Sequence, residues 1–242
     1  MKILAVIPAR YHSQRFPGKV LAKIGEQTMV ERVYRAACTC PDFNQVVVAT
    51  EHEAVAACVQ EFGGPVELTR ADHATGTDRV AEVAERYPEM DVIVNVQGDQ
   101  PFATGQILSQ LVSPFVRGEQ PPMATLACPL DPQSGYQDSH TVKVICDLNN
   151  NALYFSRSPI PFFRHQKPAP VYHHLGFYAF TREFLQTYSE LTPTPLEQCE
   201  DLEQLRALEW GYKIQVSVIE QFLMEVNTLS DWEAANALIA SQ

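Results

Sequence analysis

The 242-residue sequence predicts an α/β fold: a mostly parallel, doubly wound sheet with helices on both of its faces. Two observations lead to this fold class. Short apolar runs alternate with segments whose apolar residues recur at helical spacing, which is the rhythm of strands joined by crossover helices. In addition, apolar residues make up 45% and charged residues 19% of the chain, which is an ordinary globular composition. A chain of this length and composition can bury one sizeable core.

The first half of the chain alternates regularly between the two kinds of segment. Four apolar runs are predicted as buried strands, at 2–8, 45–50, 66–68 and 91–96. Helices are predicted at roughly 28–38, 53–62, 77–86 and 104–117. Between the first strand and the first helix, Pro17-Gly18 and Gly25 predict a loop over residues 9–27.

The second half departs from this rhythm. Strands are predicted at 123–128, 173–180 and 214–219, and helices at 183–188, 196–210 and 230–240. The alternating run at 141–147, an Asn-rich turn and the run at 152–155 predict a hairpin. Four prolines between residues 158 and 172 predict an ordered loop or lid. We therefore expect a single domain over residues 1–242 with a β-rich insertion at about 130–190.

The charge balance excludes several functional classes. A net charge of -11 argues against a protein that binds nucleic acid through a broad basic face. No apolar run approaches the ~18 residues that a membrane span needs, and the first apolar run is too short for a signal peptide. The six cysteines lack the paired spacing of a zinc site. We expect a cytoplasmic protein with neither nucleic-acid nor membrane partners.

A concentrated positive stretch stands out against this acidity. Residues 1–25 contain five Lys and Arg and no Asp or Glu. Three of these cations, Arg10, Arg15 and Lys19, follow the first strand, at the sheet edge where open α/β sheets bind ligands. Their spacing across a glycine-containing loop suits a ligand with several phosphates, with a solvated basic loop as the alternative. No Walker A loop occurs.

Two further motifs lie beside predicted strands or helices. Asp99 follows the fourth strand next to Gly98, where it suits either a Mg²⁺ ligand or a helix cap. The small, polar turn at 75–79 opens a helix, so it suits either an anion or base site or a plain N-cap by Thr75 or Thr77.

A diffuse polar set in the second half would suit a polyhydroxylated acid sugar. Within it, adjacent His173 and His174 point to opposite faces of a strand, so at most one faces a site. The set comprises Ser156, Arg157, Arg164, His174, Tyr178, Glu200, Glu203, Gln204 and Arg206.

Across these residues the sequence resembles the 3-deoxy-manno-octulosonate (Kdo) cytidylyltransferases, also called CMP-Kdo synthetases. The resemblance covers nearly the whole chain, in order. The shared blocks are I-P-A-R-Y-x-S-x-R-F-P-G-K at 7–19, V-A-T at 48–50, T-G-T-D-R at 75–79, N-V-Q-G-D-Q-P at 95–101, A-L-Y-F-S-R-S-P-I-P at 152–161, H-L-G-F-Y-A-F at 174–180 and E-D-L-E-Q-L-R-A-L-E at 200–209.

The resemblance implies a Rossmann-like nucleotidyltransferase that transfers CMP from CTP to the anomeric hydroxyl of Kdo for lipopolysaccharide synthesis. It implies Mg²⁺ as cofactor and a homodimer to which the β-rich insertion contributes. The implied catalytic residues are Arg10, Lys19, Gln97 and Asp99. The implied nucleotide-binding residues are Ala9, Arg10, Arg15, Lys19, Gly76, Thr77, Asp78 and Arg79. The implied sugar-binding residues are Arg157, Arg164, His174, Tyr178, Glu203 and Gln204.

One position departs from the family pattern. Where the family motif reads V-D-T-P-E-D, this chain has V-N-T-L-S-D at 226–231, so Asn227 stands where a second metal-binding aspartate is expected. Three interpretations stay open: an enzyme that needs more Mg²⁺, replacement by Asp231 or another acid, or an altered activity. The 8-amino analogue of Kdo as substrate and a non-catalytic nucleotide sensor are the alternatives in function. A nucleotide-sugar glycosyltransferase is disfavoured because Asp99 is not part of a D-x-D motif.

Overall fold

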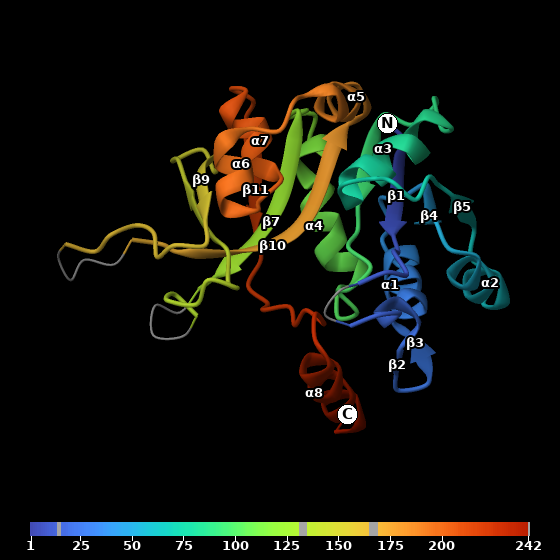
Figure 1. Ribbon diagram of the computed structural model, residues 1–242. Helices are drawn as coiled ribbons and strands as arrows, with labels where there is room; N and C mark the ends of the chain where they lie inside the picture. Colours follow the sequence, from blue (N-terminus) through green and yellow to red (C-terminus); the bar gives the residue numbers. More distant parts are fainter. Residues whose placement is uncertain (14–15, 131–134, 165–168, 242) are drawn as a thin grey trace. The chain divides into compact units, whose positions relative to one another are not determined.

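The computed structural model describes residues 1–13, 16–130, 135–164 and 169–241 (Figure 1). The chain forms two compact units, Met1–Ser109 with Leu223–Gln242, and Gln110–Phe222. The β-rich insertion that we expected at about 130–190 lies within the second unit. In the part of the chain that the structure describes, no helix is long and apolar enough to cross a membrane.

The first unit is built on four parallel strands. The strands follow the order β5–β4–β1–β6, and β1 pairs in parallel with both of its neighbours. All six residues of β1 are buried, which is the pattern of a strand covered on both faces. Three helices pack against these strands. The strands are β1 (Ile3–Pro8), β4 (Gln45–Thr50), β5 (Val66–Leu68) and β6 (Val92–Asn95), and the helices are α1 (Met29–Cys38), α2 (Glu53–Glu61) and α3 (Gly76–Glu85).

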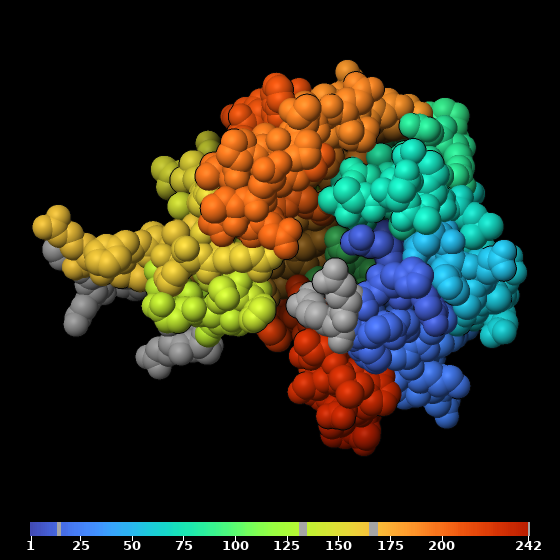
Figure 2. All heavy atoms as spheres, in the orientation of Figure 1, coloured from blue at the N-terminus to red at the C-terminus, as the bar shows by residue number. Residues whose placement is uncertain are grey.

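The expected loop at 9–27 contains short regular elements. A 3-10 helix, η1 (Lys19–Leu21), precedes a hairpin of β2 (Lys23–Ile24) and β3 (Gln27–Thr28). The last helix, α8 (Leu229–Ala240), packs on this hairpin, and the two segments lie side by side although they are far apart in the sequence (Figures 1 and 2). Ile24, Val226 and Ala235 are buried together at this contact.

The second unit holds a mixed sheet. β7 (Met123–Pro129) lies between β10 (Tyr172–Thr181), to which it is antiparallel, and β11 (Ile214–Val218), to which it is parallel. β8 (Lys143–Cys146) and β9 (Ala152–Ser156) form the predicted antiparallel hairpin. The helices are α5 (Arg182–Glu190), α6 (Pro195–Glu200) and α7 (Gln204–Glu209), and α4 (Gly105–Val116) starts in the first unit and ends in the second. The prediction of an α/β fold with a mostly parallel sheet is confirmed.

The prediction of one helix over 196–210 is wrong. The segment forms α6 and α7, separated by Asp201 in the left-handed region with φ of 52°. This break leaves the carbonyls of Glu200 and Asp201 free of helix hydrogen bonding, and the guanidinium of Arg157 binds both, at 2.7 and 3.2 Å. A side chain 43 residues away in sequence from Glu200 therefore stabilises the break, and no helical periodicity could reveal it.

Candidate functional site

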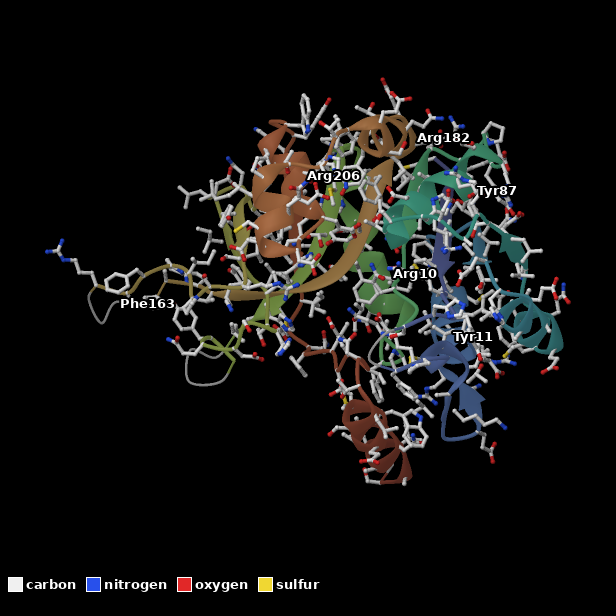
Figure 3. All side chains as sticks on the ribbon, viewed as in Figure 1. Arg10, Tyr11, Tyr87, Phe163, Arg182 and Arg206 are labelled. Carbon is white, nitrogen blue, oxygen red and sulfur yellow. The ribbon has the colours of Figure 1, made fainter. Side chains whose placement is uncertain are left out.

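The predicted basic loop leaves the sheet at the end of β1 (Figure 3). Ala9 is buried, and its N–H donates to the Ala49 carbonyl at 2.8 Å, which extends the pairing of β1 with β4 by one residue. Arg10 follows and is exposed, so the first cation emerges where the sheet ends. Arg15 lies outside the described residues.

The far end of this loop is closed by a glycine turn. The Gly18 N–H donates to the Tyr11 carbonyl at 3.0 Å, and Gly18 has φ of 67°, in the region that favours glycine. Lys19 then begins η1 directly after the turn. The position of Lys19 is thus set by the backbone of the loop.

Lys19 lies at the centre of a cluster with two other predicted site residues. Its Nζ is 2.7 Å from Asp99 Oδ2 and 3.4 Å from Asn227 Oδ1, and it also contacts the Val226 carbonyl at 3.4 Å. The side chains of Lys19 and Asp99 are 13% and 28% exposed, so the ion pair is partly shielded from water. The structure therefore brings the cation, the acid and the amide together at one place.

Gly98 explains how Asp99 reaches this cluster. A Cβ placed on Gly98 would lie 2.8 Å from the Pro8 carbonyl oxygen, closer than side chains allow. The turn after β6 therefore packs backbone against backbone on the end of β1, and Asp99 follows directly. The close neighbour of Gly98 is therefore the backbone of the chain itself. Gln97, in the same turn, is half-buried.

The turn at 75–79 forms the N-terminus of α3. Thr75 accepts a hydrogen bond from the Asp78 N–H at 3.1 Å, and Asp78 accepts one from the Thr75 N–H at 2.9 Å, which is a capping box. Thr77 is buried and accepts from Asn95 Nδ2 at 3.0 Å, which ties α3 to the end of β6. The plain N-cap by Thr75 that the sequence left open is present. A Cβ placed on Gly76 would lie 3.4 Å from the Pro8 ring.

Arg79 is a fully buried cation. Its guanidinium donates to the Thr69 hydroxyl and to the Arg70 carbonyl, and it lies 2.9 Å from Glu51 Oε2. Burial lowers the pKa of Arg79, the charge of Arg10 lowers this pKa further, and Glu51 opposes both effects. The Arg79 side chain therefore binds groups in the protein interior, where Glu51 is its counter-ion.

Glu51 is a site-supporting residue that our sequence reasoning missed. Its Oε1 accepts from the Tyr11 N–H at 3.1 Å, so one carboxylate ties the basic loop to Arg79. The Tyr11 ring also stacks on His52, with centroids 3.9 Å apart. The sequence does contain a signal for Glu51. Glu51 follows V-A-T at the end of the second predicted strand, just as Asp99 lies beyond the end of the fourth predicted strand.

The oxygen donors beside Lys19 fit a hard divalent cation. Mg²⁺ is held in proteins by one or two carboxylates, with amide, phosphate and water oxygens completing the shell. The Asp99 carboxylate and the Asn227 amide oxygen are of this kind, and both face the same lysine nitrogen. Among the described residues, no group of three or more His, Cys, Asp or Glu is placed to hold a metal ion. Phosphate oxygens of a bound nucleotide would therefore have to complete the shell.

In the second unit, three of the predicted sugar-binding residues form one buried network. Tyr178 donates its hydroxyl to Gln204 Oε1 at 3.0 Å, and Gln204 Nε2 lies 3.5 Å from His174 Nδ1. His174 Nε2 lies 2.9 Å from the Thr125 hydroxyl, which donates its only hydrogen to the Phe177 carbonyl at 2.6 Å. His174 must therefore donate from Nε2 and accept at Nδ1.

This network holds His174 neutral. Burial lowers the pKa of His174 from 6.5 to about 3, and neighbouring His173, itself lowered to about 4 mainly by burial, adds to the effect. A second proton on Nδ1 would also meet the Gln204 amide instead of an acceptor. The imidazole therefore serves as a hydrogen-bonding group and not as a cation.

Arg157 is held by the backbone of its own unit. Besides the carbonyls of Glu200 and Asp201, its guanidinium donates to the Ser139 carbonyl at 3.1 Å. Its own carbonyl accepts from Lys143 Nζ, a fully buried cation. Arg157 therefore links the segment at Ser139 to the break between α6 and α7.

The remaining predicted sugar-binding residues lie apart from these hydrogen bonds. Arg164 is exposed on the proline-rich loop. The Glu203 carbonyl accepts from the Tyr188 hydroxyl at 2.8 Å, in the break between α6 and α7. Arg206, close by in sequence, is labelled in Figure 3. Its guanidinium lies 2.5 Å from Glu197 Oε1 and 4.9 Å from the centroid of the Tyr188 ring.

Comparisons with known proteins agree with this arrangement of elements. A family model described as Cytidylyltransferase matches residues 4–214. The 3-deoxy-manno-octulosonate cytidylyltransferase of Acaryochloris marina is 58% identical over 239 residues, covering 99% of this chain and 98% of the relative. The protein of the same name from Syntrophobacter fumaroxidans is 45% identical over 245 residues, with coverages of 99% and 98%.

Solved structures show the same fold. A structure described as CMP:2-keto-3-deoxy-manno-octonic acid synthetase complexed with CTP superposes with a TM-score of 0.95 at 38% identity, covering 100% of this chain and 99% of that chain. A putative glucose-1-phosphate thymidylyltransferase from Bacillus anthracis reaches a TM-score of 0.68 at 17% identity, covering 98% and 94%. The second match is a likeness of fold alone.

Proposed function

We infer that this chain, which belongs to the 3-deoxy-manno-octulosonate cytidylyltransferases of the cytidylyltransferase family, transfers CMP from CTP to the anomeric hydroxyl of Kdo and releases pyrophosphate. The chain is a nucleotidyltransferase. The observation that carries the proposal is 58% identity over 99% of the chain to a relative of that name. We place the reaction in lipopolysaccharide synthesis and in the cytoplasm, where CTP is supplied.

The proposed chemistry is an in-line attack on the α-phosphorus of CTP, in which the protein positions the reactants and neutralises charge. Arg10 and Lys19 hold the triphosphate, because one is an exposed cation at the end of β1 and the other follows in the closed loop. Arg15 acts with them. Ala9 and the N-terminus of α3, Gly76 to Asp78, bind the nucleotide, and Gln97 lies near the reacting groups. Arg79 supports this terminus from the interior, where it pairs with Glu51.

We propose Mg²⁺ as the cofactor, held by Asp99 and Asn227. When bound, the ion would supply positive charge to the phosphates and the leaving pyrophosphate. Asp99 and Lys19 neutralise each other when they form their ion pair. Lys19 can therefore neutralise phosphate oxygens only when its hydrogen bond to Asp99 is replaced by a hydrogen bond to phosphate.

We propose that the second unit binds the sugar acid through Arg157, Arg164, His174, Tyr178, Glu203 and Gln204. The exposed Arg164 suits a carboxylate, whereas the neutral His174 network suits hydroxyl groups. We also propose a homodimer formed through the second unit. Exposed apolar side chains on its hairpin and proline-rich loop, Leu148, Leu153 and Phe162, support this.

Pyrophosphate release from CTP and Mg²⁺ tests the proposal, with Kdo and its 8-amino analogue compared side by side. Release with Kdo is expected. Release only with the amino sugar would identify the 8-amino analogue as the substrate in place of Kdo. No release with either sugar over a wide range of Mg²⁺ would overturn the proposal in favour of a nucleotide sensor.

The Lys19→Ala variant tests the phosphate site. It should raise the KM for CTP because a point charge near the triphosphate is removed. Lys23→Ala is the matched control, since Lys23 is an exposed cation of the same acid-free stretch. Equal KM values for CTP in the two variants would show that Lys19 does not bind the triphosphate.

A further inference from the structure

A carboxylate that the sequence analysis did not single out lies beside Asn227. Asn227 Nδ2 donates to Glu225 Oε2 at 3.0 Å, while Asn227 Oδ1 faces Lys19 Nζ at 3.4 Å. Gln100 Nε2 donates to the other oxygen of Glu225 at 3.2 Å. The Asn227 amide thus bridges a cation and an anion. A carboxylate at position 227 could not do this, because it has no hydrogen to donate when ionised.

The backbone fixes Glu225 and Asn227 beside the Asp99 turn. Val226, the residue between them, donates its N–H to the Asp99 carbonyl at 3.0 Å, and its own carbonyl lies 3.4 Å from Lys19 Nζ. The Val226 side chain is fully buried against the hairpin and α8. Glu225 and Asn227 therefore flank an anchored residue.

Asp231, the other acid near Asn227, already has a structural role. Its Oδ2 accepts from the N–H groups of Asn227 and Thr228 at 2.9 and 2.8 Å, and Thr228 accepts in return from the Asp231 N–H. This capping box starts α8. A shift of Asp231 into the Asp99 site would leave these N–H groups without their acceptor.

We propose that Glu225 supplies the second carboxylate charge of the Asp99 site and that Asn227 positions it. The inference rests on the proposed function, since it concerns the Mg²⁺ that we assign to Asp99. The negative charge that Asn227 lacks is thereby provided two residues earlier in the chain. Asp99 and Glu225 together give the one or two carboxylates typical of a magnesium site shared with phosphates. An uncharged residue at 227 also avoids a third carboxylate beside Asp99 and Glu225.

Binding of Mn²⁺ to the full chain with CTP present tests this proposal without requiring turnover. Free Mn²⁺ is measured by electron paramagnetic resonance for the wild type, Glu225→Gln and Glu233→Gln. Glu233 is an exposed acid of α8, so it is the matched control. We expect Glu225→Gln to weaken Mn²⁺ binding about 10-fold or more, as the loss of metal-site partners does elsewhere, and Glu233→Gln to bind like the wild type. Equal binding by all three proteins would overturn the proposal.

A double-variant cycle separates a direct role from a general loss of charge. Asn227→Asp should tighten Mn²⁺ binding strongly in the Glu225→Gln background, where the second carboxylate is missing, and only slightly in the wild type. The same gain in both backgrounds would show that positions 225 and 227 act independently, which overturns the proposal. Pyrophosphate release by the wild type is recorded in parallel. Its absence counts against the proposed function, whereas the Mn²⁺ results decide the role of Glu225.

Discussion

Lowering the pH should destabilise the second unit through His174. The imidazole is buried among Thr125, Tyr178 and Gln204, and burial lowers its pKa from 6.5 to about 3. In the unfolded chain this imidazole titrates near its ordinary value. Between pH 6.5 and pH 3 the unfolded state therefore binds more protons than the folded state, so the free energy of unfolding falls as the pH falls.

The size of the effect follows from these two pKa values. Between pH 7 and pH 5 the unfolded imidazole takes up most of one proton and the folded one takes up almost none, which removes about 2 kcal/mol of stability. Carboxylates contribute little in this window because their ordinary pKa values lie near 4. His173, with its pKa lowered to about 4, adds a loss of similar size.

Urea unfolding at pH 7 and pH 5 measures the difference directly. In the His174→Gln variant, the difference between the two pH values should shrink by about 2 kcal/mol, because the titrating group is gone. His140→Gln removes an exposed imidazole and should keep the wild-type difference. An unchanged difference in His174→Gln, or an NMR titration of His174 with its midpoint above pH 5, would refute the reasoning.

Three other substitutions test the packing that positions the site. Gly98→Ala would place a Cβ 2.8 Å from the Pro8 carbonyl oxygen, so it should cost about 1–3 kcal/mol and lower kcat/KM for pyrophosphate release by displacing the Asp99 turn. Glu51→Gln leaves the buried Arg79 without its counter-ion, and urea unfolding should show a loss of about 3–5 kcal/mol. Arg157→Ala removes three hydrogen bonds to carbonyls and should cost roughly 1–3 kcal/mol in the same assay.

Matched variants distinguish these effects from a simple change of charge. Glu26→Gln and Arg164→Ala alter exposed side chains and should leave the free energy of unfolding within about 0.5 kcal/mol of the wild type. If Glu51→Gln were no less stable than Glu26→Gln, the buried ion pair would not be needed. Full activity in Gly98→Ala would show that the turn can move without carrying Asp99 with it.

The sequence anticipated the neighbourhood of Lys19 and Asp99 by a simple rule. Both residues follow neighbouring parallel strands, β1 and β6, and such strands end at one edge of the sheet. The turn at Gly18 then closes the loop after β1, and Lys19 lies 2.7 Å from Asp99. Glu51 follows β4 at the same edge and obeys the same rule. Glu225 does not, because it lies in an irregular segment whose position only its contacts reveal.

The sequence by itself determined most of the segments of this protein that become strands and helices, and which predicted site residues follow β1 and β6. These features depend on near neighbours in the chain, through side-chain periodicity and backbone freedom. Tertiary structure decided the break between α6 and α7, the buried partners of Arg79 and His174, and the bridge from Lys19 through Asn227 to Glu225. Each of these joins residues distant in sequence, and buried polar groups adopt such arrangements because each needs a partner that only the folded chain brings within reach.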